Sequence, residues 1–188
     1  MSSADPAPGP KPSLRGLALE SIAHGLSHGR ELPVDPADHP QSWRAPGACF
    51  ITLRIDGRLR GCTGSLEATR PLVIDVVKNA YRTAFSDPRF TPVTRDELPL
   101  LEVKVSVLSA PEPFPVESEA DLLSRLRPGV DGLILLDGNH RATFLPAVWE
   151  GLPKPSDFLD ALREKAGLPP GYWSPTLRFE RYTATNGG

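Results

Sequence analysis

The sequence predicts an α+β fold built from antiparallel hairpins and packed helices. Asp56-Gly57 and residues 137–140 each separate two runs of strand-forming residues, which is typical of a hairpin turn. Apolar residues at helical spacing lie before, between and after these hairpins. The expected order is therefore helix, hairpin, helix, strand, helix, hairpin, helix, strand. Hairpins join antiparallel strands, so this order excludes a purely parallel, doubly wound sheet.

The expected elements follow from local signals. They are a helix from about Leu14 to Ser27, a hairpin over residues 47–62, a helix from Pro71 to near Ser86, a strand over residues 101–108, a helix ending at Leu126, a hairpin over residues 133–145, a helix capped by Ser156 and a strand over residues 177–183. Gly29 and Gly167 are expected to stop the first and last helices. Residues 186–188 are expected to fray.

The composition indicates a globular chain in a reducing compartment. The 188 residues are 39% hydrophobic and 23% charged, and the net charge of -2 gives no general attraction to nucleic acid or to an anionic membrane. Two cysteines, Cys49 and Cys62, are too few for a disulfide scaffold or a four-cysteine zinc site. No apolar run approaches the roughly 18 residues of a membrane span. We expect a cytoplasmic protein with a flexible tail over residues 1–13.

The stretch around Cys62 is where we expect the chemistry of this chain. Gly61 and Gly64 bracket the thiol, so the backbone is expected to turn sharply there and to let another group approach closely. A reactive thiolate needs its pKa lowered from about 8.5 by a cation or a helix N-terminus. Arg60, Arg70 and the helix that follows are candidates to supply that field or to bind an anion. The alternative is a small buried thiol that packs a tight turn.

Other polar residues give weaker signals. Glu102 lies on the polar face of the expected strand over residues 101–108 and is a candidate proton acceptor, although a solvated sheet face is the simpler interpretation. His24 and His28 are four residues apart and share a helix face, as metal ligands can. No acidic or cysteine pattern completes that site, so we expect surface histidines, no metal and no cofactor.

A run of basic residues surrounds the Cys62 stretch. It consists of Arg54, Arg58, Arg60, Arg70, Lys78 and Arg82. Such a run suits a phosphate, a nucleotide or an RNA segment, but it is more often a solvated face. The glycine spacing matches neither a P-loop nor a dinucleotide fingerprint.

A series of short segments in a fixed order forms the most specific pattern in the chain. They are residues 47–54 with the Asp-Gly turn, Leu59-Arg60-Gly61-Cys62-Thr63-Gly64, Asp87-Pro88-Arg89-Phe90, Glu97-Leu98 with residues 101–109, Asp131-Gly132-Leu133, Phe144-Leu145-Pro146 with Val148-Trp149, and residues 158–168. Together they resemble the AMMECR domain family, also called AmmeMemoRadiSam system protein A. The resemblance departs at Thr63, where the family commonly carries an aliphatic residue.

The resemblance implies a single domain over residues 14–185, made of two unequal lobes, with the Cys62 signature near the cleft between them. It also implies association, by gene context, with a Memo-type protein and a radical S-adenosylmethionine protein. It brings no agreed reaction, so it informs the fold more than the function.

Two functions stay open. The first is an accessory component that binds a substrate or a partner and acts with the Memo-type and radical proteins. It is favoured because no complete set of acid, base and nucleophile occurs at recognisable spacing. The second is an enzyme with Cys62 as a reactive thiol in the cleft, Arg60 tuning it or binding an anion, and Glu102 accepting a proton. Its substrate would be a nucleotide or RNA.

Overall fold

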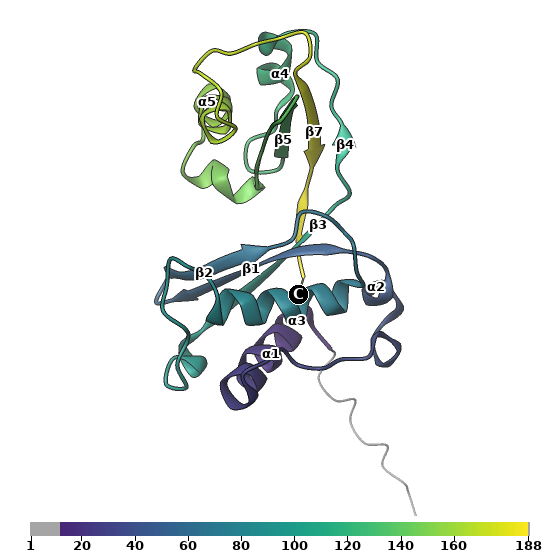
Figure 1. Ribbon diagram of the computed structural model, residues 1–188, viewed down its shortest axis with the longest axis vertical. Coiled ribbons are helices and arrows are strands. Elements are labelled where there is room, and N and C mark those ends of the chain that lie inside the picture. The colour runs from purple at the N-terminus through teal and green to yellow at the C-terminus, as the bar shows by residue number, and fades with distance from the viewer. Residues whose placement is uncertain (1–11, 188) are drawn as a thin grey trace, which may run out of the picture. The chain divides into compact units, whose positions relative to one another are not determined.

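The computed structural model describes residues 12–187, and it confirms the α+β fold with two four-stranded antiparallel sheets (Figure 1). The predicted tail over residues 1–13 lies almost wholly outside the described residues. The helices are α1 Leu14–His28, α2 Gln41–Arg44, α3 Leu72–Phe85, α4 Glu119–Arg125 and α5 Pro155–Lys165, with 3-10 turns at Pro36–Asp38, Leu98–Leu100 and Pro146–Glu150. The strands are β1 Ala48–Ile55, β2 Arg58–Gly64, β3 Glu102–Leu108, β4 Glu112–Pro113, β5 Gly132–Asp137, β6 His140–Phe144, β7 Arg178–Tyr182 and β8 Ala184–Asn186.

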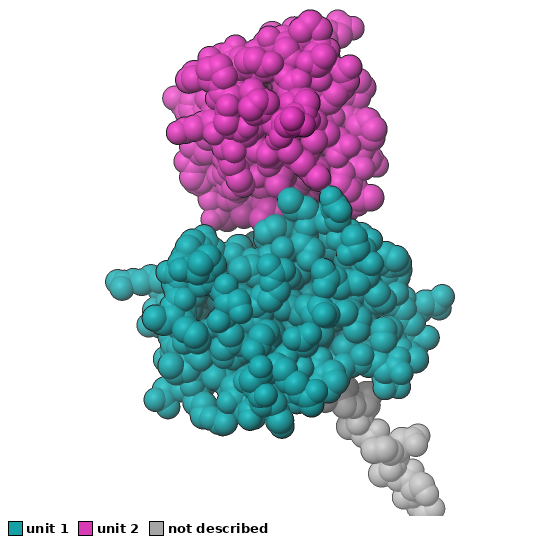
Figure 2. All heavy atoms as spheres, in the orientation of Figure 1, with its two compact units in different colours: residues 1–107, 186–188 teal, residues 108–185 magenta. Residues whose placement is uncertain are grey.

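The chain divides into two compact units, which Figure 2 colours separately. Unit 1 comprises residues 1–107 and 186–188, and unit 2 comprises residues 108–185. Each unit has its own sheet and its own buried apolar cluster. Within residues 12–187, every helix falls short of the length and apolarity that a membrane span demands.

Unit 1 is a sheet of order β2-β1-β3-β8 with α1 and α3 against one face (Figure 1). Side chains alternate across a strand, so Cys49, Ile51 and Leu53 of β1 are buried against the helices. Phe50 and Thr52 therefore point to the opposite face and are only partly buried. The buried apolar cluster of this unit includes Leu17, Ala18, Ile22, Cys49, Ile51, Leu53, Val73, Val76, Val77, Ala80, Val103 and Val105.

The β1–β2 hairpin confirms the predicted turn and corrects the predicted backbone at the cysteine. Asp56 and Gly57 have φ values of 51° and 73°, as a primed two-residue turn requires. Past that turn, Gly61 and Gly64 lie inside β2 and pair with Leu53 and Phe50 of β1. The prediction of a sharp turn around the cysteine is therefore wrong, because both glycines serve an extended strand rather than a bend.

Unit 2 is a sheet of order β4-β7-β5-β6 with α4 and α5 packed against a second apolar core. The predicted hairpin is present as β5 and β6, with Leu133 paired to Phe144. The last helix begins at Pro155 rather than after a Ser156 cap, because proline suits the first helical position. The predicted fraying is also wrong at Asn186, which belongs to β8, and the Gly187 amide donates to Val105 O at 2.9 Å.

Candidate functional site

Cys62 lies on the sheet face of unit 1 that points away from α1 and α3. It pairs with Thr52 of β1, whose side chain shares that face. The residue is half-buried, and its Sγ lies 3.5 Å from Thr52 Oγ1. Cys62 is therefore not a sealed core thiol, unlike Cys49, whose residue is wholly buried.

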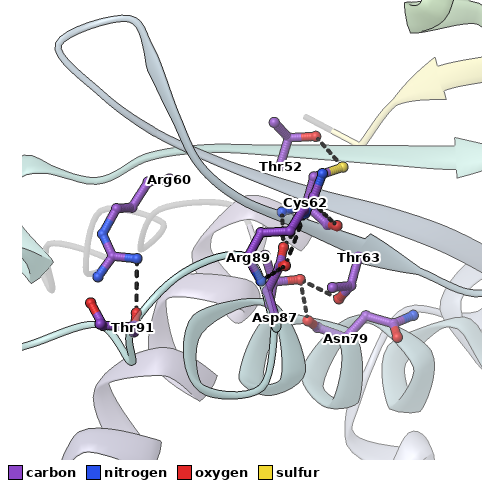
Figure 3. Close-up of polar contacts among 9 residues, drawn as sticks. Thr52, Arg60, Cys62, Thr63, Asn79, Asp87, Arg89 and Thr91 are labelled. Atoms are coloured by element: carbon purple, nitrogen blue, oxygen red, sulfur yellow. Dashed lines mark hydrogen bonds and ion pairs between the residues drawn. The ribbon is translucent and has the colours of Figure 1, made fainter.

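Asp87 and Arg89 clamp the backbone of Cys62 from the outer edge of β2 (Figure 3). The Cys62 amide donates to Asp87 Oδ2 at 2.9 Å, and Arg89 Nη2 donates to Cys62 O at 2.8 Å. β2 is the end strand of its sheet, so these two side chains replace the hydrogen bonds that a neighbouring strand would make. The clamp fixes the position of the thiol and also closes the sheet edge there.

The Asp87 carboxylate is fully occupied by this clamp. It is buried and accepts hydrogen bonds from the Arg89 amide, Nε and Nη2 as well as from the Cys62 amide. The Arg89 guanidinium is the main cause that holds the pKa of Asp87 well below its usual range. Asp87 is consequently a poor proton acceptor and a strong anchor. The Arg89 side chain is 55% exposed and keeps a face toward solvent.

Arg60 serves a different contact from the one expected of it. Its guanidinium bonds both Glu97 carboxylate oxygens, at 2.7 and 3.0 Å, and donates to the carbonyl of Thr91 at 3.0 Å. This pairing lowers the pKa of Glu97 to about 2. Figure 3 shows Arg60 lying apart from the clamp. The cation that contacts Cys62 is therefore Arg89.

The two glycines allow close packing. A Cβ on Gly61 would lie 2.8 Å from the carbonyl oxygen of Thr83 in α3, and one on Gly64 would collide with the Phe50 ring and the Cys49 carbonyl oxygen. Thr63, between them, bonds Thr83 through their hydroxyls at 2.6 Å. The expected close approach is thus made by groups of the chain itself.

Arg70 lies near Cys49 and not near Cys62. It contacts Asp75 at 3.3 Å, and that wholly buried carboxylate accepts the Cys49 amide, the Ser65 hydroxyl and an Asn79 amide hydrogen. Burial, followed by the charge of Asp75, raises the pKa of Cys49 well above its usual range. Asp75 therefore belongs to the core beneath β1, and Arg70 contacts it from a partly exposed position.

Glu102 lies near the tip of the hairpin. Its Oε1 accepts the Gly57 amide at 3.4 Å, whereas Cys62 lies farther along the hairpin, opposite Thr52. Histidines do not supply a base either. The rings of His28 and His140 bond carbonyls of His24 and Ala166, and within residues 12–187 no imidazole is hydrogen-bonded to the Cys62 thiol. The residues around the thiol thus offer a hydroxyl, Thr52, and a cation, Arg89, but no general base.

The residues that contact Cys62 but were not predicted from the sequence are Asp87, Arg89 and Thr52. The Asp87-to-Phe90 segment stands out in the sequence as part of the family pattern, but its contact spans 25 positions and leaves no local trace. Thr52 was detectable in principle, because strand pairing across a two-residue turn sets which residue opposes Cys62. The inter-lobe cleft itself stays a prediction.

These features define a two-unit α+β protein with a clamped, half-buried cysteine on the end strand of its first sheet. The model of one protein family, AMMECR1, matches residues 16–186. The chain belongs to the AMMECR1 family.

Relatives support this assignment along most of the chain. A protein of Methanothermobacter thermautotrophicus is 42% identical over 174 residues, covering 89% of this chain and 88% of the relative. A protein of Thermotoga maritima is 33% identical over 168 residues, with coverages of 88% and 91%. The crystal structure of an uncharacterised protein from Pyrococcus horikoshii superposes with a TM-score of 0.81 at 33% identity, over 91% of this chain and 87% of that one.

Proposed function

We propose that this protein is a binding component, presenting the Cys62 face of unit 1 to a partner or a substrate. Within the family setting, its partners are a Memo-type protein and a radical S-adenosylmethionine protein. The observation that carries the proposal is the closed clamp, because the Asp87 carboxylate is used entirely for holding Cys62 and Arg89. Such a site positions a surface and lacks the base that turnover on a thiol requires.

The electrostatics of the face support recognition of an acidic or anionic group. Arg89 and Arg60 are each paired with one carboxylate, Asp87 and Glu97, but the Arg89 side chain is 55% exposed and that of Arg60 only 15%. The Nε and Nη2 donors of Arg89 already bind Asp87 and the Cys62 carbonyl, so an anionic group would meet the Nη1 end, which makes no hydrogen bond within the described residues. Thr52 and the thiol add two weaker polar contacts on the same face.

A second function is favoured by one observation, the half-exposed thiol beside a guanidinium. In that case Cys62 is the nucleophile of an enzyme, with an anionic substrate such as a nucleotide or RNA held by Arg89 rather than Arg60. The missing base would have to come from the substrate or from a partner protein. If RNA were bound, its affinity should fall steeply with salt.

Two substitutions of one residue separate these functions. In a reconstitution with the Memo-type and radical S-adenosylmethionine proteins, Cys62→Ser keeps the shape of the face and removes the thiol chemistry. Cys62→Trp keeps no thiol and also covers the face. The binding function predicts that Cys62→Ser retains partner capture and turnover of the assembly, whereas Cys62→Trp loses both.

The matched control is Ser124→Trp, which adds the same bulk at an exposed position of α4 in unit 2. It should leave partner capture intact, and circular dichroism should show that each variant is folded. If Cys62→Ser loses turnover while partner capture is unchanged, the result would contradict the binding function and support the enzyme function. If Cys62→Trp still captures the partner, the partner does not bind the face that carries Cys62.

A further inference from the structure

The edge of the unit 1 sheet that lies opposite to β2 is only partly covered. The sheet order is β2-β1-β3-β8, so β8 is the outer neighbour of β3. Two backbone hydrogen bonds of 2.9 Å fix their antiparallel register, because the Ser109 amide donates to Thr183 O and the Gly187 amide donates to Val105 O. The end of β8 therefore lies opposite Val105, and within the described residues no strand covers the start of β3.

Val103 presents its backbone to this open edge. Backbone groups two residues apart in a strand point to the same side, and the Val105 carbonyl points toward β8. The N–H and C=O groups of Val103 therefore point to that side as well, past the end of β8. An unpaired strand edge of this kind is a template for a further strand.

A groove follows this edge from the end of β8. Its volume is about 530 Å³, and it is lined by residues 102–105 of β3, by Asn186 and Gly187, and by Arg15 of α1. The groove thus begins where β8 ends and runs along the part of β3 that β8 leaves uncovered. All of its walls belong to unit 1.

Two cations flank the groove on the two faces of the sheet. Side chains alternate across β3, so Lys104 points to the face away from the helices, whereas Arg15 belongs to α1 on the helix side. Both are exposed, and within residues 12–187 neither forms an ion pair. Glu102 also lines the groove, and its carboxylate accepts the Gly57 amide at the hairpin tip. Two cations against one carboxylate leave the groove with a net positive charge.

We propose that this groove binds an extended acidic segment of a partner protein, which adds a strand to β3. Val103 exchanges backbone hydrogen bonds with the added strand, and these supply the affinity. Neighbouring residues of a strand point to opposite faces, so two adjacent acidic side chains reach Arg15 and Lys104. This surface is separate from the face that carries Cys62, because β2 and β8 are the two opposite ends of the sheet.

A second copy of this chain does not fit the same edge. Antiparallel pairing of two β3 strands about Val103 would place Leu101 of the second copy opposite Val105. The Val105 carbonyl already accepts the Gly187 amide there, so the two chains would compete for one position. The occupant is therefore a segment of different sequence.

The test is an NMR titration of the isotope-labelled full chain with the peptide acetyl-Val-Glu-Glu-Val-Thr-amide. The amide signals of Val103 and Lys104 should shift, and the Val103 amide should exchange with solvent more slowly when the peptide is bound. Lys104→Glu and Arg15→Glu change exposed positions, so both variants should fold. Each should weaken binding at least about tenfold, because a like charge then faces the peptide.

The matched control is Lys154→Glu, which reverses an exposed charge in unit 2 and should bind the peptide as the unmodified chain does. Two control peptides separate charge from backbone pairing. Lysines in place of both glutamates should weaken binding at least about tenfold. Methylation of both glutamate amides should abolish binding, since adjacent amides point to opposite sides and one of them must face β3.

Four results would overturn the proposal. They are no binding to the unmodified chain, equal binding by the methylated peptide, equal binding by Lys104→Glu, and an edge that is already filled. The last would appear as a Val103 amide that exchanges, without peptide, as slowly as the Lys104 amide, which points toward β1. If that protection rises with protein concentration, a second copy fills the edge, and otherwise the chain itself does.

Discussion

Cys49 and Cys62 lie on neighbouring strands of one hairpin, and a similar clamp holds both. In each case a buried aspartate accepts the cysteine amide at 2.9 Å, Asp75 for Cys49 and Asp87 for Cys62. Each aspartate also contacts an arginine. The surroundings of the sulfur differ, since Cys49 is sealed among the helices while Cys62 is half-buried on the other sheet face. The comparison teaches that the pleat of the strands places one cysteine in the core and the other on the opposite face of the sheet.

The two aspartates should show the largest difference. Asp75→Ala leaves the Cys49 amide, the Ser65 hydroxyl and an Asn79 hydrogen without their acceptor, all in or near the core. We expect a loss of about 3 kcal/mol in the free energy of unfolding, against about 2 kcal/mol for Asp87→Ala. Urea denaturation of the two variants measures both. A larger loss for Asp87→Ala would reverse the comparison.

Gly61 tests how tightly β2 lies on α3. Gly61→Ala puts a Cβ 2.8 Å from the backbone oxygen of Thr83, which cannot move without shifting α3. The expected cost is about 1–3 kcal/mol in urea denaturation. Gly151→Ala is the control, because its nearest atom would be 3.8 Å away, and it should change stability by less than about 0.5 kcal/mol. Equal effects would mean that the glycine is not needed for packing.

The Arg60–Glu97 pair should make stability depend on acid. The folded pKa of Glu97 is lowered to about 2 from an ordinary 4.5. A depressed carboxyl pKa stabilises the fold above 4.5, and that stabilisation is lost as the pH falls from 4.5 toward 2. Glu97→Gln should therefore cost about 1–2 kcal/mol at pH 7 and almost nothing near pH 2. Urea midpoints across this range check it, and a pH-independent cost would contradict the ion pair.

Threonines on the two faces of the hairpin should give the smallest difference. Thr63→Val removes a hydroxyl pair with Thr83 on the helix side, at an expected cost of about 1 kcal/mol. Thr52→Val removes only the weak contact with the Cys62 sulfur and should cost less than about 0.5 kcal/mol. Thermal unfolding of both variants compares them. A costlier Thr52→Val would indicate that the Cys62 face is packed as tightly as the core.

Local signals explain how much of the fold was predictable. Asp56-Gly57 determines the hairpin because both residues adopt positive φ, and Pro71 marks the start of α3. Short elements such as β4 and α2 were missed, because two to four residues show no periodicity. The β8 strand was missed because its pairing with β3 joins distant parts of the chain.

The site was less predictable than the fold. Arg60, two residues before Cys62, was a candidate to supply its field, and a shared face would require a regular strand between them. The register instead shifts between Leu53 and Arg54, leaving Arg60 as an extra residue, and such a bulge redirects its side chain. Asp87 and Arg89 reach Cys62 from 25 and 27 positions away, a contact that depends on tertiary structure alone.

Alkylation of the folded protein tests the contrast between the two thiols most directly. Iodoacetamide at neutral pH, followed by peptide mass spectrometry, reports each cysteine separately. The account predicts that Cys62 is labelled in the folded chain, while Cys49 reacts at least about 100-fold more slowly and only through unfolding. Protection of Cys62 until the chain is denatured would contradict it and return both cysteines to the core.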